Sequence, residues 1–195
     1  MTTLRLRHIM LLIHGYFCII GDDGVKSYYS LVLTLIVFIS GLTAGCNSNK
    51  STPALDYWYE AKPIVVDHID KVGRPIANVI LEVGPELRAG DKSAARKFIT
   101  VLKDTLPDRN KTYVQLSKLG APGGVAGTWH LAQLKAWGMQ LQATQMLLSC
   151  WNFTEGVATC AEEDANRASK AWDDSLFAGQ EADRLQQDLV SSLTK

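Results

Sequence analysis

Apolar residues recur at steps of three and four over most of the chain, which is the spacing of an amphipathic helix. Between residues 58 and 87 this stripe is interrupted only by Lys62 and has the period of a coiled coil. Its apolar members are Trp58, Val65, Ile69, Val72, Ile76, Val79, Val83 and Leu87. Because the stripe keeps its phase across Pro63 and Pro75, we expect one long helix with kinks there, closed by Gly84-Pro85 and Gly90.

Three further segments have the same spacing. The second runs from Asp91 to Gly120, with Pro107 as a kink or a break, and the third covers residues 125–150. The fourth begins at the capping box Thr159-Cys160-Ala161-Glu162 and continues to about Leu193. Long alternating strand patterns are absent and the connections are short. The sequence therefore predicts an all-α fold, an antiparallel up-down bundle of about four long helices with proline kinks.

An uncharged run precedes the helical part. It extends from Ser27 to Gly45, follows Lys26, and ends in the small residues Thr43-Ala44-Gly45 before Cys46. A basic start, an apolar core and a small-residue cleavage site are the features of a secretory leader. The segment resembles the lipobox signal peptide of bacterial lipoprotein precursors, with Thr43 where leucine is commonest. The resemblance implies cleavage before Cys46 and a palmitate-type lipid anchor on that cysteine. A retained transmembrane helix is the alternative, because the uncharged run is just long enough to span a bilayer.

The resemblance divides the chain into parts. Residues 25–45 would be the signal peptide, residues 46–53 the lipidated tether, and residues 54–195 the helical bundle domain. Residues 1–24 contain a second, competing hydrophobic segment. We interpret them as a mis-assigned upstream extension, with the true start at Val25.

Charge excludes one class of partner. Residues 1–45 hold three of the 20 basic and two of the 20 acidic side chains, which leaves 17 and 18 in the mature part and a net charge of −1. This balance provides no basic surface of the kind that nucleic acid requires. Asn47 follows the lipidated cysteine, and by resemblance to enterobacterial sorting rules this favours the outer membrane. The mature domain would then face the periplasm.

Two cysteines, Cys150 and Cys160, fall between the third and fourth predicted helices, with Gly156 between them. In a continuous helix their Cα atoms would lie about 15 Å apart, too far for a disulfide, so the chain must reverse. We expect a disulfide, as is usual outside the cytoplasm, with a redox pair as the alternative. The bridge would place Ala132 opposite Gly179.

Candidate chemistry is sparse. His68 and His130 are the histidines of the mature part, and we interpret them as surface or hydrogen-bonded residues rather than metal ligands. No metal and no cofactor is predicted. Trp151 and Phe153 at the tip of the helical hairpin would form a partner-binding patch if exposed, or else pack over the disulfide.

Two functional hypotheses follow. The favoured one is a non-catalytic interaction or scaffold module that binds another envelope protein, because nucleophile, base and stabiliser do not occur together. The alternative is a carrier or sensor of a small apolar ligand held within the bundle, in a cavity lined by Met139, Met146 and Trp172. Neither hypothesis makes the protein an enzyme.

Overall fold

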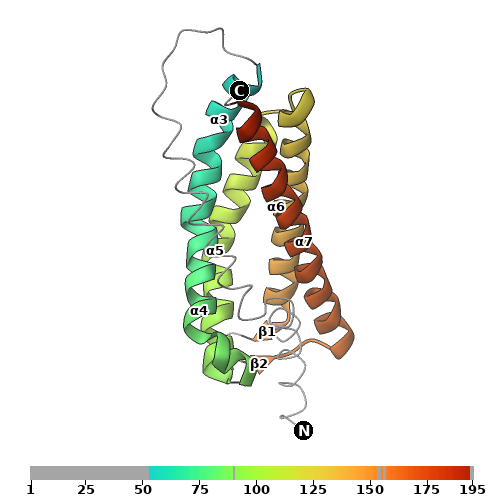
Figure 1. Ribbon diagram of the computed structural model, residues 1–195. Helices are drawn as coiled ribbons and strands as arrows, with labels where there is room; N and C mark the ends of the chain where they lie inside the picture. Colours follow the sequence, from blue (N-terminus) through green and yellow to red (C-terminus); the bar gives the residue numbers. More distant parts are fainter. Residues whose placement is uncertain (1–52, 90, 153–154, 156, 194–195) are drawn as a thin grey trace.

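The computed structural model describes residues 53–193 apart from residues 90, 153–154 and 156 (Figure 1). This part of the chain is almost entirely helical, which confirms the predicted all-α class. The predicted leader, the predicted lipidation site Cys46 and most of the predicted tether lie outside the described residues. Within those residues, no helix combines the length and the apolar character needed to cross a bilayer.

The first long helical segment consists of three parts in succession: α3 (Pro53–His68), the π-helix η1 (Ile69–Gly73) and α4 (Arg74–Ala89). The N–H of Arg74 donates to the carbonyl of Ile69, five residues back, which is the spacing of a π-helix. As predicted, the helical conformation continues across Pro63 and Pro75.

Of the residues predicted to close this helix, Gly84-Pro85 lie inside it, because α4 continues through both to Ala89, the residue before Gly90. A proline within a helix lacks one hydrogen-bond donor, and packing on either side can offset this loss. Here Val83 and Leu87 are both buried in the core.

The second segment is the single helix α5 (Lys92–Lys118), which continues through Pro107. Its N-cap is Asp91, whose Oδ1 accepts a hydrogen bond of 2.8 Å from the N–H of Ala94. The third segment, α6 (Gly124–Ser149), ends one residue before Cys150.

A short hairpin that the sequence analysis missed joins α6 to the last helix. Strands β1 (Trp151–Asn152) and β2 (Val157–Ala158) pair antiparallel, and strands of two residues are too short to show an alternating pattern. Helix α7 (Glu162–Leu193) begins later than predicted. The predicted capping residue Thr159 belongs to the hairpin instead, where its N–H donates to the carbonyl of Cys150 at 2.9 Å.

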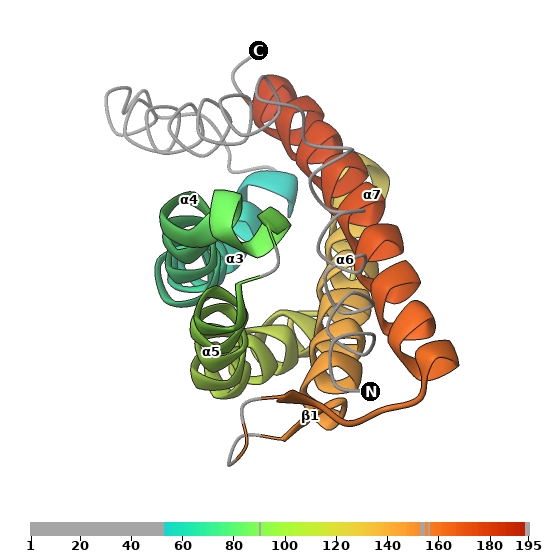
Figure 2. The ribbon, with the colours of Figure 1, turned by 90° about the horizontal axis from the view of Figure 1, so that it is seen from below.

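The segments pack against their neighbours in the chain. Helix α5 packs against both α4 and α6, and α7 packs mainly on α6 (Figures 1 and 2). The β hairpin and the connection from α4 to α5 lie at one end of the molecule, which we call the hairpin end. Pro53 and the C-terminal end of α7 lie at the opposite end, the terminal end.

The buried apolar side chains form two clusters. The hairpin-end cluster contains Val72, Ile76, Val79, Ile80, Val83, Leu87, Ala94, Ala95, Phe98, Ile99, Leu102, Ala143, Trp151, Ala165 and Trp172. The terminal cluster contains Tyr57, Trp58, Ala61, Val65, Leu116, Ala126, Trp129, Trp137 and Leu189. Most of the apolar stripe predicted on the first segment is buried, and its residues are divided between the two clusters. The core is therefore split along the length of the helices.

Helix α6 buries a face that is rotated from the predicted one. Trp129 and Ala136 are buried as expected, but Ala132 is half-buried and Val125 is exposed. The buried face also includes polar residues, among them Gln133, which a search for apolar positions does not find. The cause is that α6 packs on α7 on one side and on α3 and α5 on the other.

The predicted pairing of Ala132 with Gly179 is wrong. A Cβ atom added at Gly179 would lie 3.7 Å from the side-chain nitrogen of Gln140 and would meet no atom of Ala132 within 4 Å. The prediction assumed that the helices face each other directly from the disulfide. Because α7 begins only at Glu162, after β2 and a short turn, the facing positions are displaced.

Candidate functional site

Buried polar side chains separate the two apolar clusters. On α5 they follow Leu102 of the hairpin-end cluster and precede Leu116 of the terminal cluster. On the first segment, a polar residue likewise lies between Val65 and Val72. The residues at this level are His68, Thr105, Arg109, Thr112, Gln140 and Ser175, and we call them the polar layer. All of them are buried except Gln140, which is half-buried.

His68 is held by α5 and α6. Its Nδ1 lies 2.7 Å from Oγ1 of Thr112, and its ring stacks on Trp137 with 3.9 Å between centroids and 14° between planes. The Thr112 hydroxyl also lies 2.9 Å from the carbonyl of Asp108, to which it donates. A hydroxyl has one proton, so when Thr112 donates to this carbonyl it accepts from His68, and the ring then carries its proton on Nδ1.

Arg109 places a positive charge in the centre of the bundle. Its side chain is 1% exposed. Its Nη1 donates to Oε1 of Gln140 at 3.3 Å, and its guanidinium carbon lies 5.9 Å from the centroid of the Trp172 ring, a cation–π arrangement. The aromatic face and the amide oxygen thus solvate the charge.

The electrostatics of the layer keep His68 neutral. Burial and, to a smaller extent, the nearby charge of Arg109 lower the pKa of His68 to about 3, whereas Asp67 has a weaker, opposite effect. At neutral pH the layer therefore contains a cationic guanidinium beside an uncharged imidazole.

Arg109 and Thr112 were not predicted as core residues, although their spacing in the sequence marks them as buried positions. Thr105, Arg109 and Thr112 continue the steps of three and four that connect Leu102 to Leu116. The helical spacing of the buried face therefore continues through this region, but the residues that occupy it are polar instead of apolar. Following the spacing alone, without requiring apolar residues, would have identified them as buried.

The second histidine is also buried and hydrogen-bonded. The hydroxyl of Tyr57 and Nδ1 of His130 form a hydrogen bond that links α3 to α6. Tyr57 packs edge-to-face on Trp129, with centroids 6.1 Å apart. Burial raises the pKa of Tyr57 and lowers that of His130. The prediction was that the two histidines are either surface residues or hydrogen-bonded residues. Both are buried and hydrogen-bonded, and neither lies on the surface.

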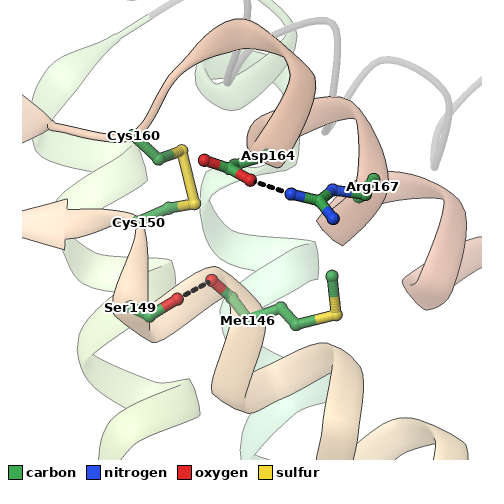
Figure 3. The surroundings of a disulfide bond; sticks show 6 residues. All are labelled: Met146, Ser149, Cys150, Cys160, Asp164 and Arg167. Atoms are coloured by element: carbon green, nitrogen blue, oxygen red, sulfur yellow. Dashed lines mark hydrogen bonds and ion pairs between the residues drawn. A yellow bond between two sulfur atoms is a disulfide. The ribbon is translucent and has the colours of Figure 1, made fainter.

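Cys150 and Cys160 are joined by a disulfide, in agreement with the sequence prediction (Figure 3). Their Cα atoms are 4.7 Å apart. Beside the bond, Ser149 donates to the carbonyl of Met146, and Asp164 forms an ion pair with Arg167 (Figure 3). The disulfide therefore links the end of α6 to the chain just before α7.

Of the two residues predicted to form the partner-binding tip, Trp151 is not exposed. Trp151 is 6% exposed and belongs to the hairpin-end cluster, because its strand β1 directs the indole into the core. Phe153 lies outside the described residues. The other interpretation, that Trp151 packs near the disulfide, agrees with its burial next to Cys150.

The residues predicted to line a ligand cavity lie in different surroundings. Trp172 is buried and packs edge-to-face on Phe98, with centroids 6.4 Å apart. Met139 and Met146 are half-buried. A shallow, open hollow lies instead over the first turns of α7, where it is lined by Glu162, Glu163, Asn166, Arg167 and Lys170.

The described residues do not gather a metal site. Within them, no group of three or more histidine, cysteine, aspartate or glutamate side chains lies close enough to hold an ion. Comparison with known protein families, with curated proteins and with solved structures finds no match to this chain.

Asp183 on α7 is expected to reduce stability at neutral pH. Burial raises its pKa to about 6 from 3.8, so the folded state binds this proton more tightly than the unfolded state does. Stability therefore falls as pH rises from about 4 to 6, and the full cost remains above pH 6. Asp183→Asn is expected to raise the free energy of unfolding by about 1–3 kcal/mol at pH 7.5.

The measurement is urea unfolding of both proteins at pH 7.5 and at pH 3.5. The gain from Asp183→Asn should nearly disappear at the lower pH, where the wild-type carboxyl is mostly protonated in both states. Asp174→Asn is the control, since Asp174 is paired with Lys170 at 2.7 Å on the surface. An equal gain at both pH values would contradict this explanation.

Proposed function

We propose that this chain is a lipid-anchored bacterial envelope protein whose helical domain is a non-catalytic module for binding another envelope protein. The proposed anchor is a lipid on Cys46, and the proposed location is the periplasmic face of the outer membrane. The proposal that the module is non-catalytic is supported by the burial and the contacts of the polar layer. Its imidazole and guanidinium bond to neighbouring side chains inside a packed core, where no substrate can reach them.

The proposed architecture of the module is an antiparallel up-down bundle with bends at its prolines. Two features support it. Consecutive segments pack on each other through short connections. The π-helix η1 ends at Gly73, two residues before Pro75, and π segments and prolines are both known causes of sharp bends.

The alternative, a carrier or sensor of a small apolar ligand, has less support. Such a protein needs an apolar cavity, and Met139, Met146 and Trp172 were the residues proposed to line it. Trp172 is occupied by contacts with Phe98 and Arg109. We therefore retain the interaction module as the proposal.

Exposed aromatic side chains are the sites at which to search for the partner. Phe177 on α7 is 55% exposed, and Tyr59 on α3 is 61% exposed. A photoactivatable phenylalanine analogue placed at each position in living cells should capture a defined envelope protein from at least one of them. The same analogue at Gln180, an exposed polar position, is the matched control. Absence of any position-dependent product would count against the module.

Cys46→Ser tests the anchor. We expect the substitution to abolish labelling by an alkyne fatty acid, and to leave the protein either in its longer precursor form or in the soluble fraction. Metabolic labelling, gel mobility and membrane sedimentation measure the three effects. Ser48→Ala, two residues away, should behave like the wild type. Unchanged fractionation together with unchanged size would favour the retained transmembrane helix instead.

A further inference from the structure

We propose that the polar layer is a proton-triggered hinge: when His68 takes up a proton, the terminal cluster opens while the hairpin-end cluster stays folded. This inference goes beyond the proposed function and does not depend on the lipid anchor. It concerns a response of the fold itself to acid.

The position of His68 in the chain suits a hinge. His68 is the last residue of α3, and η1 begins at Ile69. A π-helix inside an α-helix often marks a functional site, because its hydrogen bonds are displaced by one residue from the α-helical pattern. The first segment is therefore divided at His68, with Val65 in the terminal cluster on one side and Val72 in the hairpin-end cluster on the other.

The contacts of His68 suit the neutral ring. With its proton on Nδ1, the ring donates to Thr112 and stacks on Trp137. A second proton would have to bind Nε2 and would add a positive charge to a ring that is 7% exposed. The buried guanidinium of Arg109 would repel that charge.

Among the described residues, the charges near His68 favour the neutral ring on balance. Arg109 is the charged group that faces His68 from α5, whereas α6 contributes the uncharged Trp137. On the same helix as His68, the carboxylate of Asp67 attracts the proton but already forms ion pairs with Lys71 at 2.7 Å and Lys111 at 3.6 Å. In the polar layer, α7 contributes the uncharged Ser175. Relief of the repulsion therefore requires the ring to reach water.

Two features direct the opening to the terminal end. The hairpin-end cluster has the larger set of buried residues, and the disulfide between Cys150 and Cys160 links α6 to α7 there. The terminal cluster has no such covalent link within the described residues. Local opening occurs first where the fewest stabilising contacts must be lost.

The size of the response follows from the two proton affinities. In the open state the ring has its ordinary pKa of 6.5, whereas in the closed state its pKa is about 3. Opening therefore becomes more favourable as the pH falls below 6.5. At pH 4.5 the opening equilibrium should be about 100-fold greater than at pH 7.

Hydrogen–deuterium exchange of the full chain at pH 7 and pH 4.5, read by mass spectrometry and expressed as protection factors, tests the proposal. We expect peptides from α3 to lose about 100-fold in protection at pH 4.5. Peptides from α4 should lose far less. Equal loss in both would show global unfolding and would overturn the hinge.

Variants assign the effect to His68. In His68→Gln the pH-dependent loss in α3 should disappear, while in His130→Gln, which removes the other buried histidine, it should persist. The opposite pattern would overturn the proposal. Arg109→Gln provides a second measurement that holds even if His68→Gln does not fold. Removing the repulsion should raise the closed-state pKa of His68, so that α3 loses less protection between pH 4.5 and pH 3 than in the wild type, and an equal loss over that interval would also overturn the proposal.

Discussion

Trp129→Ala is expected to lower the free energy of unfolding by about 3–5 kcal/mol, the range for removing a large aromatic side chain from a packed core. Trp129 is 0% exposed and packs edge-to-face on Trp58, with ring centroids 5.6 Å apart. It also contacts Tyr57, so its removal would leave a cavity where α3 meets α6. Urea unfolding followed by circular dichroism measures the effect.

Two variants make this result specific. Trp129→Phe should cost only about 1 kcal/mol, because it leaves a smaller cavity and the indole N–H of Trp129 makes no hydrogen bond within the described residues. Phe177→Ala, at an exposed aromatic position, should change stability by less than about 0.5 kcal/mol. If Trp129→Ala were as mild as Phe177→Ala, the terminal cluster would not be packed as described.

Gly127→Ala is expected to cost about 3 kcal/mol, at the upper end of the range for overpacking. Gly127 lies in the first turn of α6, beneath the connection from α5. A Cβ atom added there would lie 1.9 Å from the carbonyl oxygen of Pro122, which is far inside van der Waals contact. Because that oxygen belongs to the backbone, the loop itself would have to move. Thermal and urea unfolding of the variant measure the cost.

Gly138→Ala is the matched control, since it makes the same change in the same helix. Its new Cβ would lie 3.4 Å from Cε2 of Tyr113, an ordinary contact. Alanine also favours the helix over glycine, by up to about 1 kcal/mol. Gly138→Ala should therefore be neutral or stabilising. A similar loss in both variants would indicate a general intolerance of α6 to substitution rather than a close approach at Gly127.

Periodicity predicted the helical segments well where apolar residues mark the buried face. The stripe on the first segment includes Trp58, Val72 and Leu87, all of which are buried. This success has a simple cause: such a helix has one face toward the core, so spacing and residue type give the same answer. Helix α6 has two buried sides, and there the apolar pattern predicted a face that is rotated from the one the structure buries.

Helix ends were predicted less well than helices. Gly84-Pro85 has the composition of a terminus, yet α4 continues through it because the packing of Val83 and Leu87 outweighs the local preference. Thr159 has the composition of an N-cap, but it is part of the hairpin that precedes α7. Signals over a few residues compete with tertiary contacts whose strength the local sequence does not reveal.

The sequence by itself determined the all-α class and the pairing of Cys150 with Cys160, because helical spacing and a chain reversal between two cysteines are local properties. Only the tertiary structure decided the polar layer. His68 and Arg109 come from different helices, α3 and α5, and both are residue types that usually lie on the surface. They are buried because Thr112, Trp137, Gln140 and Trp172 supply their contacts. A polar group can be buried without a large cost only where such partners surround it, and tertiary packing decides which side chains those are.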